Sequence, residues 1–230
     1  MTSKQWVTSG ATIVALAVIV LSGTTLLRSP RVQAADNDSE ESKIQRGFAI
    51  APVPLNLARK NRALVGLGSY IVNAHADCNG CHSAGPETEY SLGGNPYLRF
   101  PEFFSGKKVV NPETYLGGGR DFGPIGPVEH LYSRNLTPDR TGLPAGGRTF
   151  EEFVEIMRNG TDFDHVHPNC PAPNCFPPPF NGDLLQVMPW PVYQDMTDRD
   201  LRAIYEYLSA IPCNPGPGIA GAEYLQNVCQ

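Results

Sequence analysis

The sequence predicts a mostly α-helical domain with few helices and long irregular loops. Of its 230 residues, 22 are Pro and 23 are Gly, so about a fifth of the chain favours turns and loops. Three segments show apolar residues at helical spacing, and they begin at residues 61, 149 and 197. The stretch 85–119 has no firm helical period, so we expect a small β-hairpin or an irregular ordered excursion there.

The N-terminal segment has the features of an export signal. Residues 5–27 carry no charge, and as a helix rising about 1.5 Å per residue they are long enough to cross a bilayer core of about 30 Å. The run Ala11 to Leu21 also suits a signal peptide, and residues 32–34 (VQA) resemble a cleavage site. Residues 1–34 are interpreted as a cleaved signal peptide or a retained anchor. Either predicts a periplasmic or otherwise exported protein, soluble after cleavage or held by its N-terminal helix.

The first helical segment, residues 61–77, leads into the motif DCNGCH at 77–82. A C-x-x-C pair alone is compatible with a zinc half-site, a redox dithiol or a disulfide. The adjacent His82 separates these alternatives, because in C-x-x-C-H two thiols bond the vinyl groups of one haem and the imidazole binds its iron. The motif predicts one covalently bound haem c, attached through Cys78 and Cys81, with His82 as the proximal ligand.

Three internal methionines are candidates for the sixth position of the iron, where a thioether favours an electron carrier. Met157 belongs to the apolar stripe of the second helix, and Met196 fits a hydrophobic staple at the start of the third. Met188 lies in a Pro-stiffened loop with no such packing role, so it is the predicted distal ligand. The alternatives are His75, His130, His165 and His167.

The second and third helices also carry N-terminal signals. Thr149 and Glu152 have the spacing of a capping box, and Thr197 with Asp200 repeats it. The third helix shows one apolar face, made by Leu201, Ile204, Tyr205 and Leu208.

Taken together, these segments resemble the class I c-type cytochromes, in particular the bacterial monohaem domains found alone and as subunits of periplasmic dehydrogenases. The resemblance covers about residues 60–212 and implies a class I cytochrome c fold, with few helices around one haem. The matching motifs are DCNGCH at 77–82, GPIG at 123–126, NLTPD at 135–139, and the segments 141–160 and 187–212.

The resemblance also implies roles for single residues. The methionine of the M-P loop, Met188, is the distal ligand, and the carbonyl of Pro124 accepts the second N–H of the proximal imidazole. The first and last helices cross through a small residue and an aromatic one, here Gly68 and Tyr205.

Four residues near these motifs are candidate haem contacts. Trp190 and Tyr193 are expected to shield the iron or bond a haem propionate, with ordinary core packing as the alternative. Arg120 and Arg134 are candidate propionate partners, with plain surface arginines as the alternative.

The remaining four cysteines allow three disulfide connectivities. In an oxidising compartment we expect Cys170 to pair with Cys175, and Cys213 then to pair with Cys229 and close the tail. The alternative is a tetrahedral zinc site made by His165, His167, Cys170 and Cys175.

These assignments divide the chain after its export segment. Residues 35–58 are expected to be an acidic, solvated linker. The monohaem domain follows over 59–213, with insertions at 85–119 and 161–182, and residues 214–230 form a tail held by a disulfide.

The expected function is single-electron transfer between exported redox partners. One alternative is an electron-accepting haem subunit of a periplasmic dehydrogenase, and a weaker one is a five-coordinate haem enzyme or sensor. No nucleophile–base pair, paired carboxylates or phosphate loop stands out, so the chain is predicted to be a carrier rather than an enzyme.

The formal net charge of −5 argues against nucleic acid or an anionic bilayer as the main partner. It predicts a redox partner with a basic docking patch, such as a dehydrogenase or respiratory-chain complex. Membrane contact is expected through the N-terminal segment alone, if that segment is uncleaved.

Overall fold

The computed structural model divides the chain into two compact units, residues 1–39 and 40–230. Residues 1–30, which hold most of the predicted export segment, lie outside the described residues. Within the described part of the chain, no helix is both long and apolar enough to cross a membrane. The structure describes residues 31–98, 106–126, 128–164, 180–222 and 225–229.

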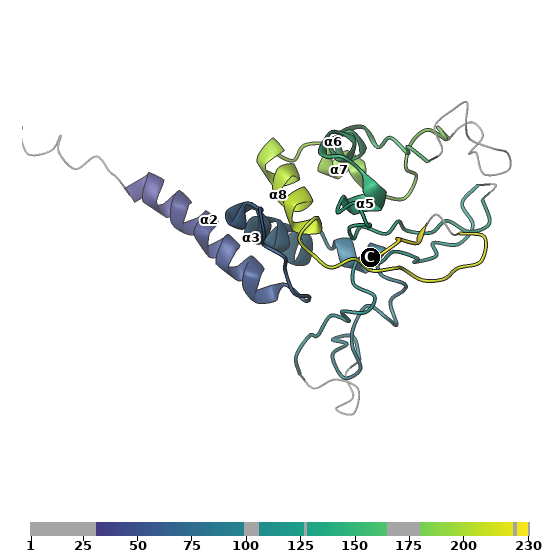
Figure 1. The fold of residues 1–230 in the computed structure, drawn as a ribbon, viewed down its shortest axis with the longest axis horizontal. Helices are drawn as coiled ribbons and strands as arrows, with labels where there is room; N and C mark the ends of the chain where they lie inside the picture. Colours follow the sequence, from purple (N-terminus) through teal and green to yellow (C-terminus); the bar gives the residue numbers. More distant parts are fainter. Residues whose placement is uncertain (1–30, 99–105, 127, 165–179, 223–224, 230) are drawn as a thin grey trace, which may run out of the picture. The chain divides into compact units, whose positions relative to one another are not determined.

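The fold is mostly α-helical, as predicted, with loops between a small number of helices (Figure 1). Among the described residues, β structure is limited to isolated bridges, of which Tyr90 with Val110 joins the two arms of the 85–119 stretch. The helices are α2 (Arg31–Ile50), α3 (Arg62–Tyr70), the π-helix η1 (Ile71–His75), α4 (Cys78–His82), α5 (Pro144–Gly147), α6 (Phe150–Asn159), α7 (Trp190–Tyr193) and α8 (Asp198–Leu208).

The predicted linker over 35–58 differs from what the structure contains. Its first part belongs to α2, and within the second unit this helix packs on α3. A Cβ added to Gly47 would lie 1.9 Å from the carbonyl oxygen of Gly66, so the two backbones touch. Ser69 Oγ also donates to the Gly47 carbonyl at 2.7 Å. The linker was predicted from the acidic composition. That composition does not show that Ile44 and Gly47, three residues apart on one face of α2, are buried.

Helices α3 and α8 lie side by side and cross at a glycine (Figure 1). A Cβ on Gly68 would lie 1.9 Å from the Ala203 carbonyl oxygen and 2.8 Å from Tyr207 Cβ. The predicted close approach at Gly68 is therefore present. The aromatic residue against it is Tyr207, whereas Tyr205 faces the aromatic rings of α6. The prediction of Tyr205 was wrong because α8 buries two tyrosines on roughly opposite faces, Tyr207 toward α3 and Tyr205 toward α6.

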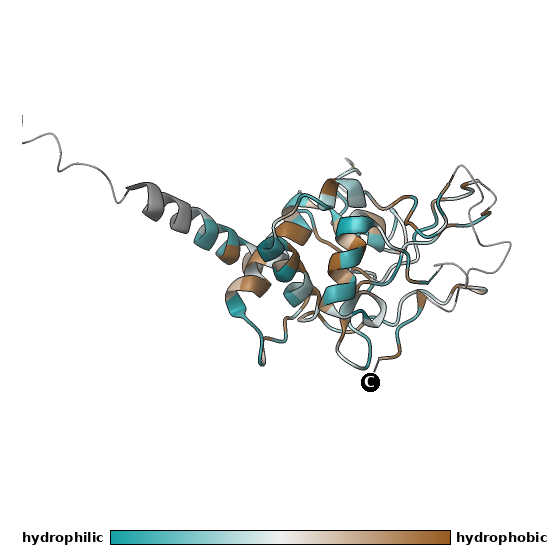
Figure 2. Cartoon of the chain, turned by 90° about the horizontal axis from the view of Figure 1, so that it is seen from above, coloured by the Kyte–Doolittle hydropathy of each residue, from teal (hydrophilic) through white to brown (hydrophobic). Residues whose placement is uncertain are grey.

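Both predicted helix caps are present. The capping box at α6 is complete, with Thr149 and Glu152 exchanging side-chain and backbone hydrogen bonds. At α8, Thr197 Oγ1 accepts a hydrogen bond from the backbone N–H of Asp200 at 3.1 Å. Coloured by hydropathy, the helices carry both hydrophobic and hydrophilic residues, as expected of amphipathic helices packed on a core (Figure 2).

A largely buried polar cluster joins α3, η1, α8 and the 85–119 stretch. The hydroxyl of Tyr115 donates to Asn73 Oδ1 at 2.6 Å and lies 2.8 Å from the hydroxyl of Tyr207. Asn73 Nδ2 donates to the carbonyl of Ser69 at 2.9 Å. Because Asn73 lies in η1, the cluster ties the long 85–119 stretch and α8 to the helix that leads into DCNGCH.

The α3–α8 crossing yields a stability prediction. Gly68→Ala is expected to lower the free energy of unfolding by about 1–3 kcal/mol, because the added methyl group overlaps the Ala203 carbonyl. An ordinary helix Gly→Ala change has the opposite sign. Thermal unfolding of the haem-loaded protein checks the prediction.

The matched control for this experiment is Gly218→Ala, where the nearest atom to an added Cβ, Gln226 Nε2, is 3.9 Å away. We expect it to unfold within about 0.5 kcal/mol of wild type. Equal unfolding temperatures for the two variants would show that the crossing has room to adjust.

Candidate haem-binding site

Both thiols and the imidazole of the DCNGCH motif lie on α4, a single short helix. Asp77 precedes it in the left-handed conformation, with φ of 48°, which turns the chain out of η1 and starts the new helix. At the other end the carbonyl of His82 accepts a hydrogen bond from the backbone N–H of Gly118 at 2.8 Å. The arrangement places Cys78, Cys81 and His82 within one turn that is fixed at both ends.

A cavity of about 660 Å³ brings these residues together with Met188. Its volume lies within the range of about 300–1,000 Å³ that is usual for small-molecule and cofactor sites. His82 and Met188 are 106 positions apart in the sequence, and both line this cavity. Apolar side chains of other elements complete the wall, namely Phe153, Met157, Leu184, Leu185, Met196 and Ile204.

The His82 ring is oriented by a backbone carbonyl. Its Nδ1 lies 2.7 Å from the oxygen of Arg134, and since a carbonyl can only accept, Nδ1 carries the proton and donates. Burial lowers the pKa of His82, and the hydrogen bond to Arg134 partly opposes this shift. The imidazole is therefore neutral at neutral pH, with its lone pair on Nε2, which is the form that binds a metal ion.

The acceptor predicted for this hydrogen bond, Pro124, was wrong. Pro124 is exposed, whereas the strand-like stretch around Arg134 is anchored by buried polar side chains. Asn135 Oδ1 accepts from the backbone N–H of Thr137 at 2.9 Å, and its Nδ2 donates to the carbonyl of Asn214 at 2.9 Å. The carbonyl that accepts from His82, that of Arg134, thus belongs to a segment held by buried hydrogen bonds, whereas Pro124 lies at the surface.

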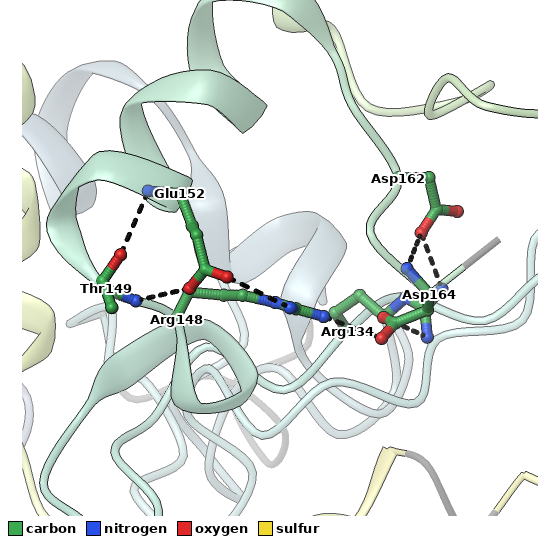
Figure 3. A network of polar contacts seen from close by, with 6 residues as sticks. All are labelled: Arg134, Arg148, Thr149, Glu152, Asp162 and Asp164. Atoms are coloured by element: carbon green, nitrogen blue, oxygen red, sulfur yellow. Dashed lines mark hydrogen bonds and ion pairs between the residues drawn. The ribbon is translucent and has the colours of Figure 1, made fainter. Parts of the chain in front are cut away.

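The side chain of Arg134 joins an ion-pair network at the start of α6 (Figure 3). Its guanidinium lies 3.3 Å from Asp162 and 3.1 Å from Asp164, and Asp164 also pairs with Arg148 at 2.7 Å. Arg148 directly precedes Thr149 of the α6 capping box. The network fixes the residue that orients His82, and the propionate contact predicted for Arg134 stays a prediction.

Burial keeps both thiols of α4 protonated. It raises the pKa of Cys78 to about 12, with a further contribution from the carboxylate of Asp77. The pKa of Cys81 is also raised by burial, although Arg120 opposes the shift. Zinc binding and thiol–disulfide exchange need a thiolate. The described part of the chain also holds no cluster of three His, Cys, Asp or Glu side chains suited to a metal ion.

Of the two aromatic residues predicted to contact the haem, one lines the cavity and the other does not. Tyr193 lines the cavity, and its hydroxyl donates to the carbonyl of Ala76 at 3.1 Å. Trp190 lies outside the lining, packs against Gly160 and donates from its indole N–H to the Leu185 carbonyl at 3.1 Å. Shielding of the iron by Trp190 is therefore not what the structure shows, because its ring fills the space beside a glycine instead. Arg120, the other candidate, donates to the carbonyl of Gly80.

Two methionines that the sequence analysis assigned to helix packing also belong to the cavity wall. Met157 and Met196 line the same cavity as Met188. The apolar stripe of α6 was assigned to core packing, and the structure shows that two of its residues, Phe153 and Met157, also line the cavity. Of the alternative histidines, His130 lines the cavity whereas His75 does not. His165, His167, Cys170 and Cys175 lie outside the described residues.

The C-terminal tail forms part of the same wall. The predicted disulfide between Cys213 and Cys229 is present. Between these cysteines, Ala220 and Ala222 line the cavity. The disulfide therefore holds one wall of the candidate site in place.

The mostly α fold and the Cys–Cys–His turn in the wall of a largely apolar cavity are compatible with a c-type haem site. No family model matches the sequence. The chain is similar to the cytochrome c subunit of alcohol dehydrogenase (quinone) from Gluconacetobacter polyoxogenes, with 29% identity over 161 residues, 70% of this chain and 24% of the relative.

Two further relatives agree with this similarity. The gluconate 2-dehydrogenase cytochrome c subunit of Pantoea cypripedii is 30% identical over 64% of this chain and 23% of its own length. The fructose dehydrogenase cytochrome subunit of Gluconobacter japonicus is 24% identical over 66% of this chain and 22% of its own length. The similarity spans less than a quarter of these relatives, and it supports a cytochrome c family for this chain.

The tail yields a prediction that links stability to the site. Replacing Cys213 and Cys229 by Ser together is expected to cost about 3 kcal/mol, because the unfolded chain loses a closed loop. For a chain of this size that corresponds to an unfolding temperature lower by roughly 6–12 °C. Differential scanning calorimetry of the haem-loaded protein measures it, and an unchanged midpoint would contradict the role given to the disulfide.

Proposed function

We propose that this protein is a monohaem c-type cytochrome of class I that carries single electrons between exported redox partners. One haem c would be attached through Cys78 and Cys81, with His82 and Met188 as the iron ligands. The bound haem supplies a Fe(III)/Fe(II) couple that gains and loses an electron without bond making. The observation that carries the proposal is the cavity that unites the oriented imidazole with a methionine 106 positions away.

The chain's own residues set the conditions for this chemistry. The Arg134 carbonyl holds His82 in one tautomer and makes Nε2 a stronger ligand. Phe153 and Ile204 present apolar surface to the cavity, which excludes water and lowers the local polarity. A dry site and ligands fixed in both oxidation states reduce the rearrangement that accompanies each electron.

A second candidate function is an electron-accepting subunit of a dehydrogenase. The observation that favours it is the identity of the relatives, which are cytochrome subunits of alcohol, gluconate and fructose dehydrogenases. In that role the chain would receive electrons from a catalytic partner and perform no substrate chemistry itself. Isolation of the native protein in a stable complex with a dehydrogenase would favour the subunit, and isolation as a monomer would favour the carrier.

The methionines provide the test of the proposed ligand. Met188→Leu is expected to abolish the methionine–iron charge-transfer band of the ferric protein and to give a high-spin spectrum, because leucine fills the space without a sulfur atom. Visible spectra of the oxidised and reduced haem-loaded protein measure both effects.

Met157→Leu and Met196→Leu are the matched controls, since both side chains line the same cavity and the exchange conserves volume. Both are expected to keep the band. If one control lost the band and Met188→Leu kept it, the methionine replaced in that control would be the distal ligand instead of Met188. A wild-type protein that is already high-spin and binds carbon monoxide readily would favour the enzyme or sensor alternative.

The acidic balance of the chain yields a second functional prediction. With a net charge of −5, electron exchange with a cationic metal complex is expected to slow as salt rises, and exchange with an anionic complex to quicken. Stopped-flow kinetics at low and high ionic strength measure the two trends. Rates independent of salt for both complexes would remove the basic docking patch from the proposal.

A further inference from the structure

The excursion over residues 85–119 carries a group of exposed apolar side chains that the proposed function does not use. Among the described residues, eight large apolar side chains are exposed, and four of them lie in this stretch. They are Leu92 at 97% exposed, Tyr97 at 78%, Leu98 at 44% and Val109 at 42%. None of the four lines the cavity of the candidate site. Single exposed apolar residues are normal on a protein surface, whereas a group of them indicates an interaction surface.

Backbone hydrogen bonds hold the two arms of the excursion together. The N–H of Ser91 donates to the Val109 carbonyl at 3.0 Å, and the N–H of Val109 donates to the Gly94 carbonyl at 3.1 Å. Gly94 permits this approach, because a Cβ added to it would lie 2.6 Å from Val109 Cβ. The ring of Tyr97 lies edge-on to that of Tyr90, with centroids 6.1 Å apart. The described residues 90–98 and 106–110 therefore form one structural unit, called the tip below.

The base of the excursion is tied to the motif helix. The stretch begins three residues after His82, and on its return the N–H of Gly118 donates to the His82 carbonyl at 2.8 Å. Thr114 Oγ1 donates to the Thr88 carbonyl at 2.7 Å, and Asn111 Nδ2 donates to the same carbonyl at 3.1 Å. A contact made by the tip is therefore connected through a few hydrogen bonds to the helix that carries His82.

The charge of the tip is opposite in sign to that of the whole chain. Lys107 and Lys108 are exposed, and the described residues of the tip include no carboxylate. In the sequence from 90 to 110, three cations (Arg99, Lys107 and Lys108) and one acid (Glu102) give a net charge of +2. The full chain has a formal net charge of −5. The tip thus combines apolar side chains with a local positive charge, which favours an anionic partner.

This combination fits a lipid surface better than a protein interface. Lysine is depleted at protein interfaces relative to the rest of the surface. At a membrane surface, tyrosine lies at the level of the headgroups, leucine enters the boundary of the acyl chains, and lysine is attracted to anionic headgroups. Leu92, at 97% exposed, makes almost no contact with its own protein, so it can enter a bilayer without breaking internal packing.

We propose that the tip of the excursion binds an anionic lipid surface, with Leu92 and Tyr97 entering the interface and Lys107 and Lys108 contacting the headgroups. This contact lies on the domain itself, so it differs from the one expected of the N-terminal segment. It holds the motif helix in one orientation to the membrane. The inference goes beyond electron transfer and does not depend on which side chain binds the iron.

Hydrogen–deuterium exchange of the haem-loaded full chain, read by mass spectrometry, tests the proposal. The protein is measured alone, with phosphatidylcholine vesicles, and with vesicles that also contain phosphatidylglycerol. With the anionic vesicles, peptides that cover the tip are expected to exchange more slowly by about tenfold. Peptides from α6 are expected to be unchanged. The readout is local, and the N-terminal segment is the same in every sample.

Paired substitutions separate the apolar and the charged contribution. Leu92→Ser combined with Tyr97→Ser is expected to remove the protection and to keep the wild-type unfolding temperature, since both side chains are exposed. Lys107→Gln combined with Lys108→Gln is expected to remove the difference between anionic and phosphatidylcholine vesicles. The matched control is Val192→Ser on α7, which is 70% exposed and does not line the cavity. It is expected to keep the wild-type protection.

Two results would overturn the lipid assignment. One is equal exchange of the tip with and without anionic vesicles, and the other is protection that Leu92→Ser with Tyr97→Ser leaves unchanged. Protection that appears without lipid, as the concentration of this chain or of another protein rises, would identify a protein interface instead. Visible spectra of the same samples test the proposed function separately, because the four substituted tip residues lie outside the cavity lining.

Discussion

The hydrogen bond from His82 Nδ1 to the Arg134 carbonyl connects the motif helix to a loop far away in the sequence, and the geometry of the candidate site depends on it. At 2.7 Å it joins the motif helix α4 to a segment 52 residues further along the chain. It sets the tautomer and direction of the imidazole, so the position of Arg134 decides where a metal bound at Nε2 can lie. Arg134 is fixed in turn by Asp162 and Asp164, next to the start of α6. The position of His82 therefore depends on the Arg134 carbonyl, and the position of Arg134 depends on its ion pairs beside α6.

A second set of contacts supports this segment from the C-terminal side. Thr137 is almost fully buried, and its hydroxyl accepts the backbone N–H of Asn214 at 2.9 Å. Asn227 Nδ2 donates to the Thr137 carbonyl at 2.9 Å. The disulfide between Cys213 and Cys229 encloses both asparagines. The tail therefore stabilises the site twice, by lining the cavity and by holding the loop that orients His82.

The features that were predicted correctly are those determined by residues close together in the sequence. The capping box of α6, the Thr197 cap of α8, the amphipathic helices and the Cys–Cys–His turn all depend on residues within a few positions of each other, and the structure contains them. The Pro124 assignment and the linker over 35–58 failed because they depend on tertiary packing. Which carbonyl meets His82 depends on buried side chains near Arg134, and the α2–α3 contact depends on a glycine at Gly47. Neither requirement can be recognised from the residues near it in the sequence.

The two sides of the cavity differ in how they are built, and this difference bears on the ligand assignment. One part of the wall is the short helix α4, which is fixed at both ends. The positions of its two thiols and its imidazole are therefore set by local bonds. The rest of the wall includes loops and helix faces, and three methionines line it. Met157 and Met196 are each placed by the packing of a helix, whereas Met188 sits in a loop between them. If His82 Nε2 bound an iron, a loop could adjust to bring the Met188 sulfur atom to it, and a side chain held by helix packing would have less freedom to do so.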